Sequence, residues 1–265
     1  MTSHIHASAV IAKGAALGAR VRIGPYCVIG DSVRLGDDVC LESHVVIAGD
    51  TELGDGCHVF PFASLGSVPQ DMKHQGEATK LVIGKRNRFG QTATVELGTV
   101  GGGGTTRIGD DGLYMIGCHI GHDSQVGSQV ILANHVALAG HVHIADYVSI
   151  GGMSAVHQFC RIGAYAMLGG ASGLKHDIIP YGIAAGNPAH LQGLNLIGLR
   201  RRGLAQQTLH NLRHAYKDVF CGEGALDARV RAAETRWTKS AEVMAMLRFI
   251  HDTDKQRGLC LPAAL

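Results

Sequence analysis

The sequence predicts a β-solenoid: a parallel β-helix of hexapeptide repeats over residues 1–190, followed by an α-helical domain over residues 191–265. Two observations predict the solenoid: an aliphatic residue returns at every sixth position over long stretches, and glycine often follows it. In parallel β-helices with this signature, each six-residue repeat, or hexad, makes one short strand and a turn. A third observation, the change to helical spacing of apolar residues after the repeats, predicts the second domain.

The first array of repeats begins at Ile5. Its aliphatic positions, each six residues after the last, are Ile5, Ile11, Leu17, Ile23, Ile29, Leu35, Leu41, Ile47, Leu53, Val59 and Leu65. A small or β-branched residue stands two places before most of them, as at Ala9, Val21 and Cys27. Neither the 3.6-residue period of a helix nor simple strand alternation produces this pattern. We therefore expect the aliphatic side chains to point into the solenoid.

Composition agrees with a solenoid and excludes several classes of function. Aromatic residues make up only 5% of the chain, so the core must consist of thin layers of Val, Ile, Leu and Ala. A net charge of +2 argues against a general nucleic-acid surface. Seven cysteines without CxxC pairs predict reduced thiols in a cytoplasmic protein. No apolar run approaches the roughly 18 residues of a membrane span, and no signal peptide is expected.

The repeat is interrupted twice. Residues 67–81 form a polar insertion that contains Asp71 and Lys73, and residues 98–107 contain a run of four glycines before Ile108. Loops that leave a solenoid often make its binding surface, so we expect the first insertion to contribute to a site. The glycine run predicts no phosphate site, because no helix is expected to follow it.

A second array leads to a helical tail. Its aliphatic residues run from Ile120 to Leu174, and it ends near Pro180. Beyond it, residues at helical spacing predict helices around Leu209, Leu212, Tyr216 and Val219, around Leu226 and Val230, and around Val243, Leu247 and Ile250. We expect these helices to cover the solenoid or to pack against neighbouring subunits. The preceding run Arg200–Arg202 is either a solvated surface or a phosphate contact.

Four histidines stand together in the second array: His119, His122, His141 and His157. If one coil of the solenoid holds three hexads, His122, Gly140 and Gln158 stack along one edge, about 4.8 Å apart. The positions lie near a turn, so we expect the imidazoles to face solvent or another subunit. Several histidines converging on one edge indicate a functional site.

Three functions remain open for this cluster. A trio of histidines can hold zinc, as in the hexapeptide-repeat carbonic anhydrases, although the His119-x-x-His122 spacing differs from that ligand pattern. Alternatively, one neutral histidine acts as a general base on an alcohol or amine, with Asp123 orienting the His122 ring. The Gly140 N–H would then donate to an acyl oxyanion. A non-catalytic binding scaffold is the third possibility.

Several segments resemble one enzyme family. They are His119-Ile-Gly-His122-Asp123, Leu132-Ala-Asn134, Ala139-Gly140-His141, Gly151 to Phe159, and Asn195 to Gly203. Together they closely resemble the acyl-[acyl carrier protein]:UDP-N-acetylglucosamine O-acyltransferases, over nearly the whole chain. The resemblance implies a left-handed β-helix with three hexads per coil, and a homotrimer with its sites between adjacent solenoids. It implies no cofactor and no metal.

The resemblance also implies an activity and residue roles. A 3-hydroxyacyl chain would pass from acyl carrier protein to the 3-hydroxyl of UDP-N-acetylglucosamine, the first step of lipid A biosynthesis. His122 would be the base, Asp123 its supporting carboxylate and Gly140 the oxyanion donor. Residues implied to contact substrate are Asp71, Lys73, His119, His141, His157 and Gln158, with Asn195, Arg201 and Arg202 near the nucleotide and its phosphates. Gly170 matches a position that limits acyl-chain length, so it would admit a longer chain.

The chain departs from the family pattern at two places. Many members read Ile-Asn-Arg-Gly-Thr where this chain reads Val95 to Thr99, with Glu96 in place of Asn, and Ile197 replaces an acidic residue. These changes bear on contacts to sugar, carrier or nucleotide, and on whether the acceptor is UDP-N-acetylglucosamine or its 3-amino analogue. A related UDP-sugar N-acyltransferase is the closest rival, but that family carries a domain before its repeats, whereas the repeats here begin at Ile5.

Overall fold

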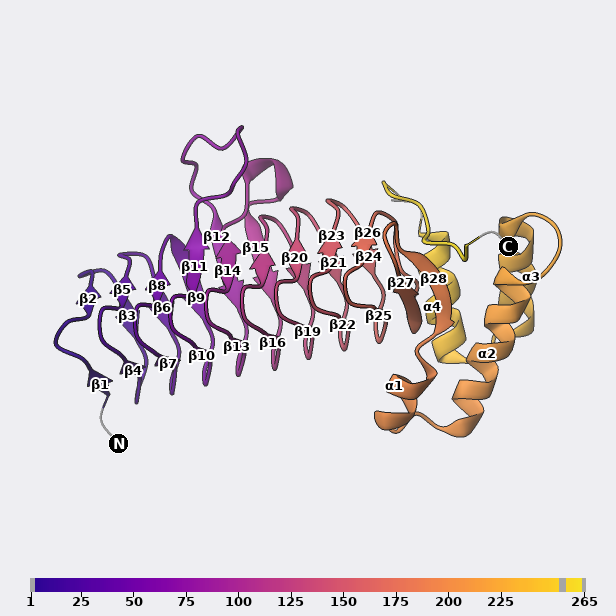
Figure 1. Cartoon of the computed structure of the whole chain (residues 1–265), viewed down its shortest axis with the longest axis horizontal. Helices are drawn as coiled ribbons and strands as arrows, with labels where there is room; N and C mark the ends of the chain where they lie inside the picture. The colour runs from indigo at the N-terminus through magenta and orange to yellow at the C-terminus, as the bar shows by residue number, and fades with distance from the viewer. Residues whose placement is uncertain (1–2, 253–255, 264–265) are drawn as a thin grey trace.

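A computed structural model describes residues 3–252 and 256–263 and shows a long three-sided solenoid with helices at its C-terminal end (Figure 1). Each side of the solenoid is one parallel sheet of short strands. The first sheet contains β1 (His4–Ile5), β4 (Arg22–Ile23), β7 (Cys40–Leu41), β10 (His58–Val59), β13 (Arg88–Phe89), β16 (Leu113–Tyr114), β19 (Ile131–Leu132), β22 (Ser149–Ile150) and β25 (Met167–Leu168).

The other two sides repeat this arrangement. The second sheet contains β2 (Val10–Ile11), β5 (Val28–Ile29), β8 (Val46–Ile47), β11 (Ser64–Ser67), β14 (Thr94–Glu96), β17 (His119–Ile120), β20 (Ala137–Leu138), β23 (Ala155–Val156) and β26 (Gly173–Leu174). The third contains β3 (Ala16–Leu17), β6 (Arg34–Leu35), β9 (Asp50–Leu53), β12 (Lys80–Ile83), β15 (Thr105–Ile108), β18 (Gln125–Val126), β21 (His143–Ile144) and β24 (Arg161–Ile162).

Strand register confirms the hexad interpretation. Ile5 pairs with Ile23 on the next coil, eighteen residues further on, so one coil holds three hexads. The repeat aliphatics fill the core: Ile23 and Ile29 are each 1% exposed, whereas Ile5, in the first coil, is 44% exposed. Because aliphatic side chains line a narrow interior, each coil buries its apolar surface mainly against the coils on either side of it.

The three corners between sheets are tight turns with a left-handed residue. At the corner that joins the second sheet to the third, Asp123, His141 and Phe159 have φ values of 60°, 59° and 66°. They are eighteen residues apart, so they stack on successive coils. L-residues adopt this conformation at a cost of about 1–2 kcal/mol each. The repeated turn therefore fixes the direction of the side chains at this corner.

Both interruptions of the repeat leave the solenoid as loops. The register shifts locally where β11 pairs with β14, between Leu65 and Ser67, and is regular again in the third sheet. Residues 68–79 run between β11 and β12, and residues 97–104 run between β14 and β15 and include a short 3-10 helix at Val100–Gly102. Ile83 of β12 still pairs with Leu53 before it and with Ile108 after it. Figure 1 shows both loops rising together from one edge of the solenoid.

The end of the solenoid differs from the hexad pattern. β27 (Gly182–Ala185) continues the first sheet in parallel, but β28 (His190–Leu194) pairs with it antiparallel, which the sequence did not predict. The helices follow: α1 (Leu196–Arg201), α2 (Gln206–Phe220), α3 (Leu226–Arg236) and α4 (Ala241–His251).

The predicted apolar faces of these helices are confirmed, since Leu209, Leu212, Val219, Val230, Val243, Leu247 and Ile250 are all buried. After α4, the segment 256–263 returns to the solenoid, where the Cys260 N–H donates to the Asp177 carbonyl oxygen over 2.8 Å. Among the residues that the structure describes, no helix is long and apolar enough to cross a membrane.

Candidate active site

A buried histidine–aspartate pair lies at the corner between the second and third sheets. His122 and Asp123 follow β17, and His122 Nδ1 lies 2.8 Å from Asp123 Oδ2. A carboxylate accepts hydrogen bonds and cannot donate them, so the shared proton belongs to Nδ1, and in the neutral tautomer with this proton Nε2 carries the lone pair. Within the described residues, Nε2 makes no hydrogen bond. The pair therefore presents a free base.

Asp123 is held by the second insertion. The Thr99 N–H donates to its Oδ1 over 2.7 Å, and the Thr99 hydroxyl donates to its Oδ2 over 2.6 Å. The Asp123 N–H in turn donates to the Thr106 hydroxyl oxygen over 2.8 Å. Asp123 is only 2% exposed, and hydrogen bonds of this kind compensate for much of the cost of burying its charge.

The backbone of Gly102 lies close to the Asp123 side chain and encloses it further. A Cβ at Gly102 would lie 2.0 Å from Asp123 Cγ, so only glycine fits against the carboxylate. The His122 imidazole was predicted to face solvent or another subunit; it does not lie open to solvent, because His122 is only 7% exposed. The glycine-rich insertion, which the repeat pattern left uninterpreted, covers this part of the corner.

Glu96 is a second buried carboxylate beside the pair. It is 1% exposed, its Oε2 accepts the His122 N–H over 3.1 Å, and its Oε1 accepts the Gln70 side-chain amide over 2.7 Å. His119 Nε2 lies 3.9 Å from Oε1. One acidic side chain therefore joins the backbone of His122 to the first insertion.

Gly140 lies directly against the His122 ring, one coil further along, as the predicted column requires. A Cβ at Gly140 would lie 2.5 Å from His122 Cε1 and 2.6 Å from Nε2. Glycine is therefore the residue that allows the ring to occupy this place. Within the described residues, the Gly140 N–H has no acceptor, so it is a free donor beside the base.

A cavity of about 700 Å³ opens beside this corner, and three of the nine predicted substrate contacts, Asp71, Lys73 and His141, line it. Asp71 and Lys73 line it from the first insertion, Thr99 from the second, and His141 and Phe159 from the corner itself. The Lys73 N–H donates to Asp71 Oδ1 over 3.0 Å, which orders this part of the loop. The cavity is lined by both cations and carboxylates, as a site for a polar ligand requires.

His141 links the cavity to the buried pair. Its ring is edge-on to His122 at 5.0 Å between centroids and is stacked on Phe159 at 4.6 Å. Burial lowers the pKa of His141 below its ordinary value, and the charge of Asp123, 3.7 Å away, offsets this only partly. His141 therefore remains neutral at neutral pH and is able to donate or accept a hydrogen bond.

The other predicted substrate contacts near this corner, His119, His157 and Gln158, are more exposed than His122. His119 is half-buried, and its Nδ1 lies 2.9 Å from the Thr94 hydroxyl. His157 and Gln158 are exposed on the next coil, where the Gln158 carbonyl oxygen accepts from Arg257 Nε over 2.7 Å. The C-terminal segment therefore packs against the end of the same column.

Four predicted residues lie elsewhere on the chain. Asn195 caps α1 by accepting the Gly198 N–H over 3.2 Å, and its amide donates to the Tyr165 carbonyl oxygen at the corner between the third and first sheets. Arg201 and Arg202 are exposed, and the Arg202 guanidinium lies 4.8 Å from the Tyr147 ring centre at that same corner. Gly170 is exposed at the corner between the first and second sheets. None of these residues shares the corner of His122.

The buried pair and His141 could also hold a cation, since each offers a ligand atom and these atoms lie within 4.8 Å of one another. The hydrogen-bond arrangement favours a base instead. Asp123 Oδ2 already accepts hydrogen bonds from both the Thr99 hydroxyl and His122 Nδ1. Because Nδ1 is the donor, the lone pair of the His122 ring lies on Nε2 and points away from the carboxylate.

Comparison with known proteins identifies the family. The acyl-[acyl-carrier-protein]–UDP-N-acetylglucosamine O-acyltransferase of Rhizobium johnstonii is 41% identical over 261 residues, which cover 98% of this chain and 96% of that protein. The chain belongs to this O-acyltransferase family. Residues 177–260 also match the family described as UDP N-acetylglucosamine O-acyltransferase, domain 2.

Solved structures of the O-acyltransferase family have the same fold. The enzyme from Moraxella catarrhalis superposes with a TM-score of 0.93 at 41% identity, covering 97% of this chain and 99% of that one. The UDP-N-acetylglucosamine acyltransferase from Campylobacter jejuni gives 0.92 at 38% identity, with the same coverage. The predicted family and the predicted left-handed parallel β-helix with C-terminal helices are both confirmed.

Proposed function

We propose that this chain transfers a 3-hydroxyacyl group from acyl carrier protein to the 3-hydroxyl of UDP-N-acetylglucosamine, the first step of lipid A biosynthesis, with His122 as general base. Membership of the O-acyltransferase family supports the reaction. The observation that carries the role of His122 is its Nδ1 bond to Asp123, which leaves a lone pair on Nε2 beside the free Gly140 N–H.

His122 Nε2 takes the proton of the acceptor hydroxyl as its oxygen forms a bond to the thioester carbonyl carbon. The carbon–sulfur bond then breaks, and the imidazolium returns its proton to the departing thiolate. Asp123 stabilises the imidazolium during this interval, because the two groups share a 2.8 Å hydrogen bond in a buried site.

Gly140 supplies the oxyanion contact in this proposal. Its N–H is free, and the missing side chain lets the His122 ring lie close to this donor, so the base and the donor can act on the same acyl group. Donors of this kind lower the barrier because they are fixed in place before charge develops on the oxygen. His141, Asp71 and Lys73 line the cavity, and His119 lies 3.9 Å from Glu96; these four residues would bind the sugar and its phosphates.

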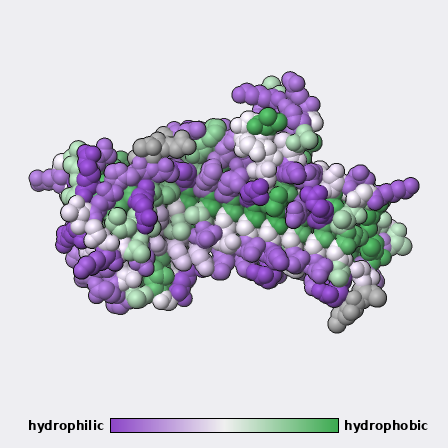
Figure 2. Space-filling view, turned by 180° about the vertical axis from the view of Figure 1, so that it is seen from behind, coloured by the Kyte–Doolittle hydropathy of each residue, from purple (hydrophilic) through white to green (hydrophobic). Residues whose placement is uncertain are grey.

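A homotrimer would complete the site. Gly170, the proposed limit on acyl-chain length, and Arg202, a proposed nucleotide contact, lie at different corners from His122. A second copy of the chain would bring another corner to the base, as would suit a site between adjacent solenoids. Figure 2 supports an interface, since a band of hydrophobic and near-neutral residues runs along the solenoid between hydrophilic edges. His157, Gln158, Asn195 and Arg201 would then contact substrate from the remaining positions.

The division of the chain fits this role. We place a β-helix domain over residues 1–190 and a helical domain over residues 191–265, with the reaction in the cytoplasm, where the free thiols of all seven cysteines would stay reduced.

The test is acyl transfer from 3-hydroxyacyl carrier protein to UDP-N-acetylglucosamine by the purified chain. His122→Ala should lower the rate by about 10²–10⁴-fold. His4→Ala, which removes an exposed histidine on the first coil, should leave the rate unchanged and serves as the matched control. An active His122→Ala protein would refute the base, and a wild type without activity at any chain length would refute the reaction.

The same assay separates the rival functions. A zinc enzyme would lose activity on treatment with a chelator and regain it with added metal, whereas the proposed base needs none. The 3-amino analogue of the acceptor, offered alongside the ordinary sugar, distinguishes N-acylation from O-acylation by the product bond. Donors of ten and fourteen carbons test Gly170, which predicts preference for the longer chain.

A further inference from the structure

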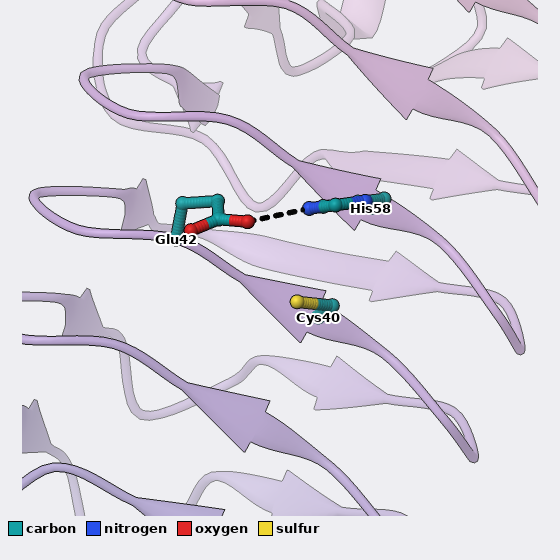
Figure 3. A group of neighbouring side chains, drawn as sticks. All are labelled: Cys40, Glu42 and His58. Carbon is teal, nitrogen blue, oxygen red and sulfur yellow. Dashed lines mark hydrogen bonds and ion pairs between the residues drawn. The ribbon is translucent and has the colours of Figure 1, made fainter.

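A second cluster of metal-binding side chains lies far from the active site, on the outer face of the first sheet. Cys40 of β7 and His58 of β10 are direct partners on adjacent coils, and Glu42 immediately follows β7 (Figure 3). Figure 3 shows the three side chains projecting from the same side of these two strands, with the Glu42 carboxylate turned toward the His58 ring. The cluster therefore joins two neighbouring coils.

The three groups form a ligand set that suits zinc. A thiolate, an imidazole and a carboxylate are the donors that Zn²⁺ takes from proteins, and sites with three protein ligands commonly hold water in the fourth position. Their ligand atoms lie within 4.8 Å of one another, and Glu42 Oε1 is 2.8 Å from His58 Nε2. Tetrahedral zinc bond lengths require ligand atoms about 3.4–3.6 Å apart.

Little movement separates the cluster from that geometry. The Glu42 and His58 side chains are 44% and 31% exposed, so they have space to adjust, while the backbone pairing of Cys40 with His58 fixes the distance between their two strands. His58 is stacked on Phe60 at 4.3 Å, which limits the rotation of its ring and keeps its Nε2 toward Glu42. The site is therefore partly organised in advance.

Two arginines flank the cluster, so the negative charges of the Cys40 thiolate and the Glu42 carboxylate would have to offset their repulsion of a cation. Along the first sheet, the neighbouring outward positions are Arg22 on one side of Cys40 and Arg88 on the other side of His58. Partial burial raises the pKa of the Cys40 thiol, and Arg22 acts in the opposite direction by favouring the thiolate. A bound cation would act in the same direction as Arg22, because metal binding deprotonates a coordinating thiol.

We propose that Cys40, Glu42 and His58 bind Zn²⁺, with water as fourth ligand, and that the ion fastens two coils of the N-terminal half of the solenoid. On binding, the Cys40 thiol proton passes to solvent and the zinc–sulfur bond forms. The proton that His58 Nε2 donates to Glu42 is also lost to solvent, and Nδ1 carries the proton of the bound neutral ring, so that Nε2 and the Glu42 carboxylate each form a bond to the metal. The site is separate from His122 and Asp123, which lie at the corner between the second and third sheets and, with His141, offer no sulfur ligand.

Cobalt(II) tests the site directly, because a thiolate–cobalt bond absorbs in the near ultraviolet and oxygen and nitrogen ligands do not give this band. The full-length protein, first dialysed against chelator, is titrated with Co²⁺ and then with Zn²⁺. We expect one equivalent of cobalt to produce the band and one equivalent of zinc to abolish it. Zinc should also raise the melting temperature, because it binds the folded chain preferentially.

Variants assign the signal to its residues. Cys40→Ser should abolish the band, and His58→Gln and Glu42→Gln should each weaken zinc binding at least tenfold. Cys221→Ser removes an exposed thiol and should leave the band intact, as should His122→Gln at the active-site corner. A folded wild type without the band, or a band that survives in Cys40→Ser or disappears in Cys221→Ser, would overturn the proposal. Circular dichroism of each variant verifies that it is folded.

Discussion

Substitution of Gly140 by alanine tests whether the position of the His122 ring matters. The added Cβ would lie 2.5 Å from His122 Cε1, so the ring must retreat by about 0.9 Å to reach an ordinary contact of 3.4 Å. The added Cβ would also lie 3.0 Å from Nδ1, the atom bonded to Asp123. Two bonds from Thr99 fix this carboxylate, so the retreat of the ring strains the 2.8 Å bond at Nδ1. Overpacking of this kind costs about 1–3 kcal/mol of stability.

The expected kinetic effect is larger than the effect on folding. A catalytic group displaced by about 1 Å loses on the order of 10²-fold in rate, which is about 2.7 kcal/mol in the barrier. We therefore expect kcat/KM in the acyl-transfer assay to fall about 100-fold, while circular dichroism shows a folded solenoid. The effect should appear mainly in kcat, since the ring is only 7% exposed and acts on the reacting hydroxyl.

Gly30→Ala is the matched control. Gly30 also follows a strand of the second sheet, but a Cβ there would meet its nearest atoms at 3.4 Å, an ordinary contact. This variant should keep wild-type activity. A folded Gly140→Ala protein with activity within about threefold of Gly30→Ala would contradict the assigned geometry of the base.

Two further predictions concern the groups around the pair. Glu96→Ala leaves the buried His122 N–H without its acceptor and should lower the free energy of unfolding by about 1–3 kcal/mol in urea titrations. Gln70→Ala removes only the exposed partner of Glu96 and serves as the control. An equal loss of stability in both variants would contradict this role for Glu96. For His141, burial places the folded pKa below the unfolded value of 6.5, so protonation favours unfolding and its contribution to stability declines as pH falls through 6.5. NMR titration of its ring should give a midpoint below 6.5, and a midpoint above that value would show that Asp123 dominates instead.

The repeat made most of the fold predictable. Aliphatic residues six apart identify inward positions directly, and the eighteen-residue pairing of Ile5 with Ile23 follows from three such steps. The antiparallel pairing of β28 with β27 was not predictable in this way, because residues after Pro180 no longer follow the hexad and carry no signal for strand direction.

The site was predictable only in part. The column of His122, Gly140 and Gln158 follows from the register, but the burial of His122 depends on the insertion between β14 and β15. Aperiodic loops carry no register, so the contact of Gly102 with Asp123 and the bonds from Thr99 could be found only from the folded chain.

Glu96 was visible in the sequence as a departure from the family pattern. Its partner Gln70 lies in the other insertion, and no spacing rule connects the two residues. Its place beside His122 therefore became clear only once both insertions were positioned over the same corner.

The eighteen-residue coil restricts how a gene for this protein can change in length. A deletion of one hexad between Asp123 and Gly140 would remove one strand and leave the others intact, yet it would move Gly140 to a different corner and separate it from His122. Insertions that leave the solenoid as loops have no such effect, since Ile83 remains paired with Leu53 and Ile108 across both of them. Length variation among relatives should therefore be concentrated in loops such as 68–79 and 97–104, with whole coils gained or lost only on either side of the catalytic ones.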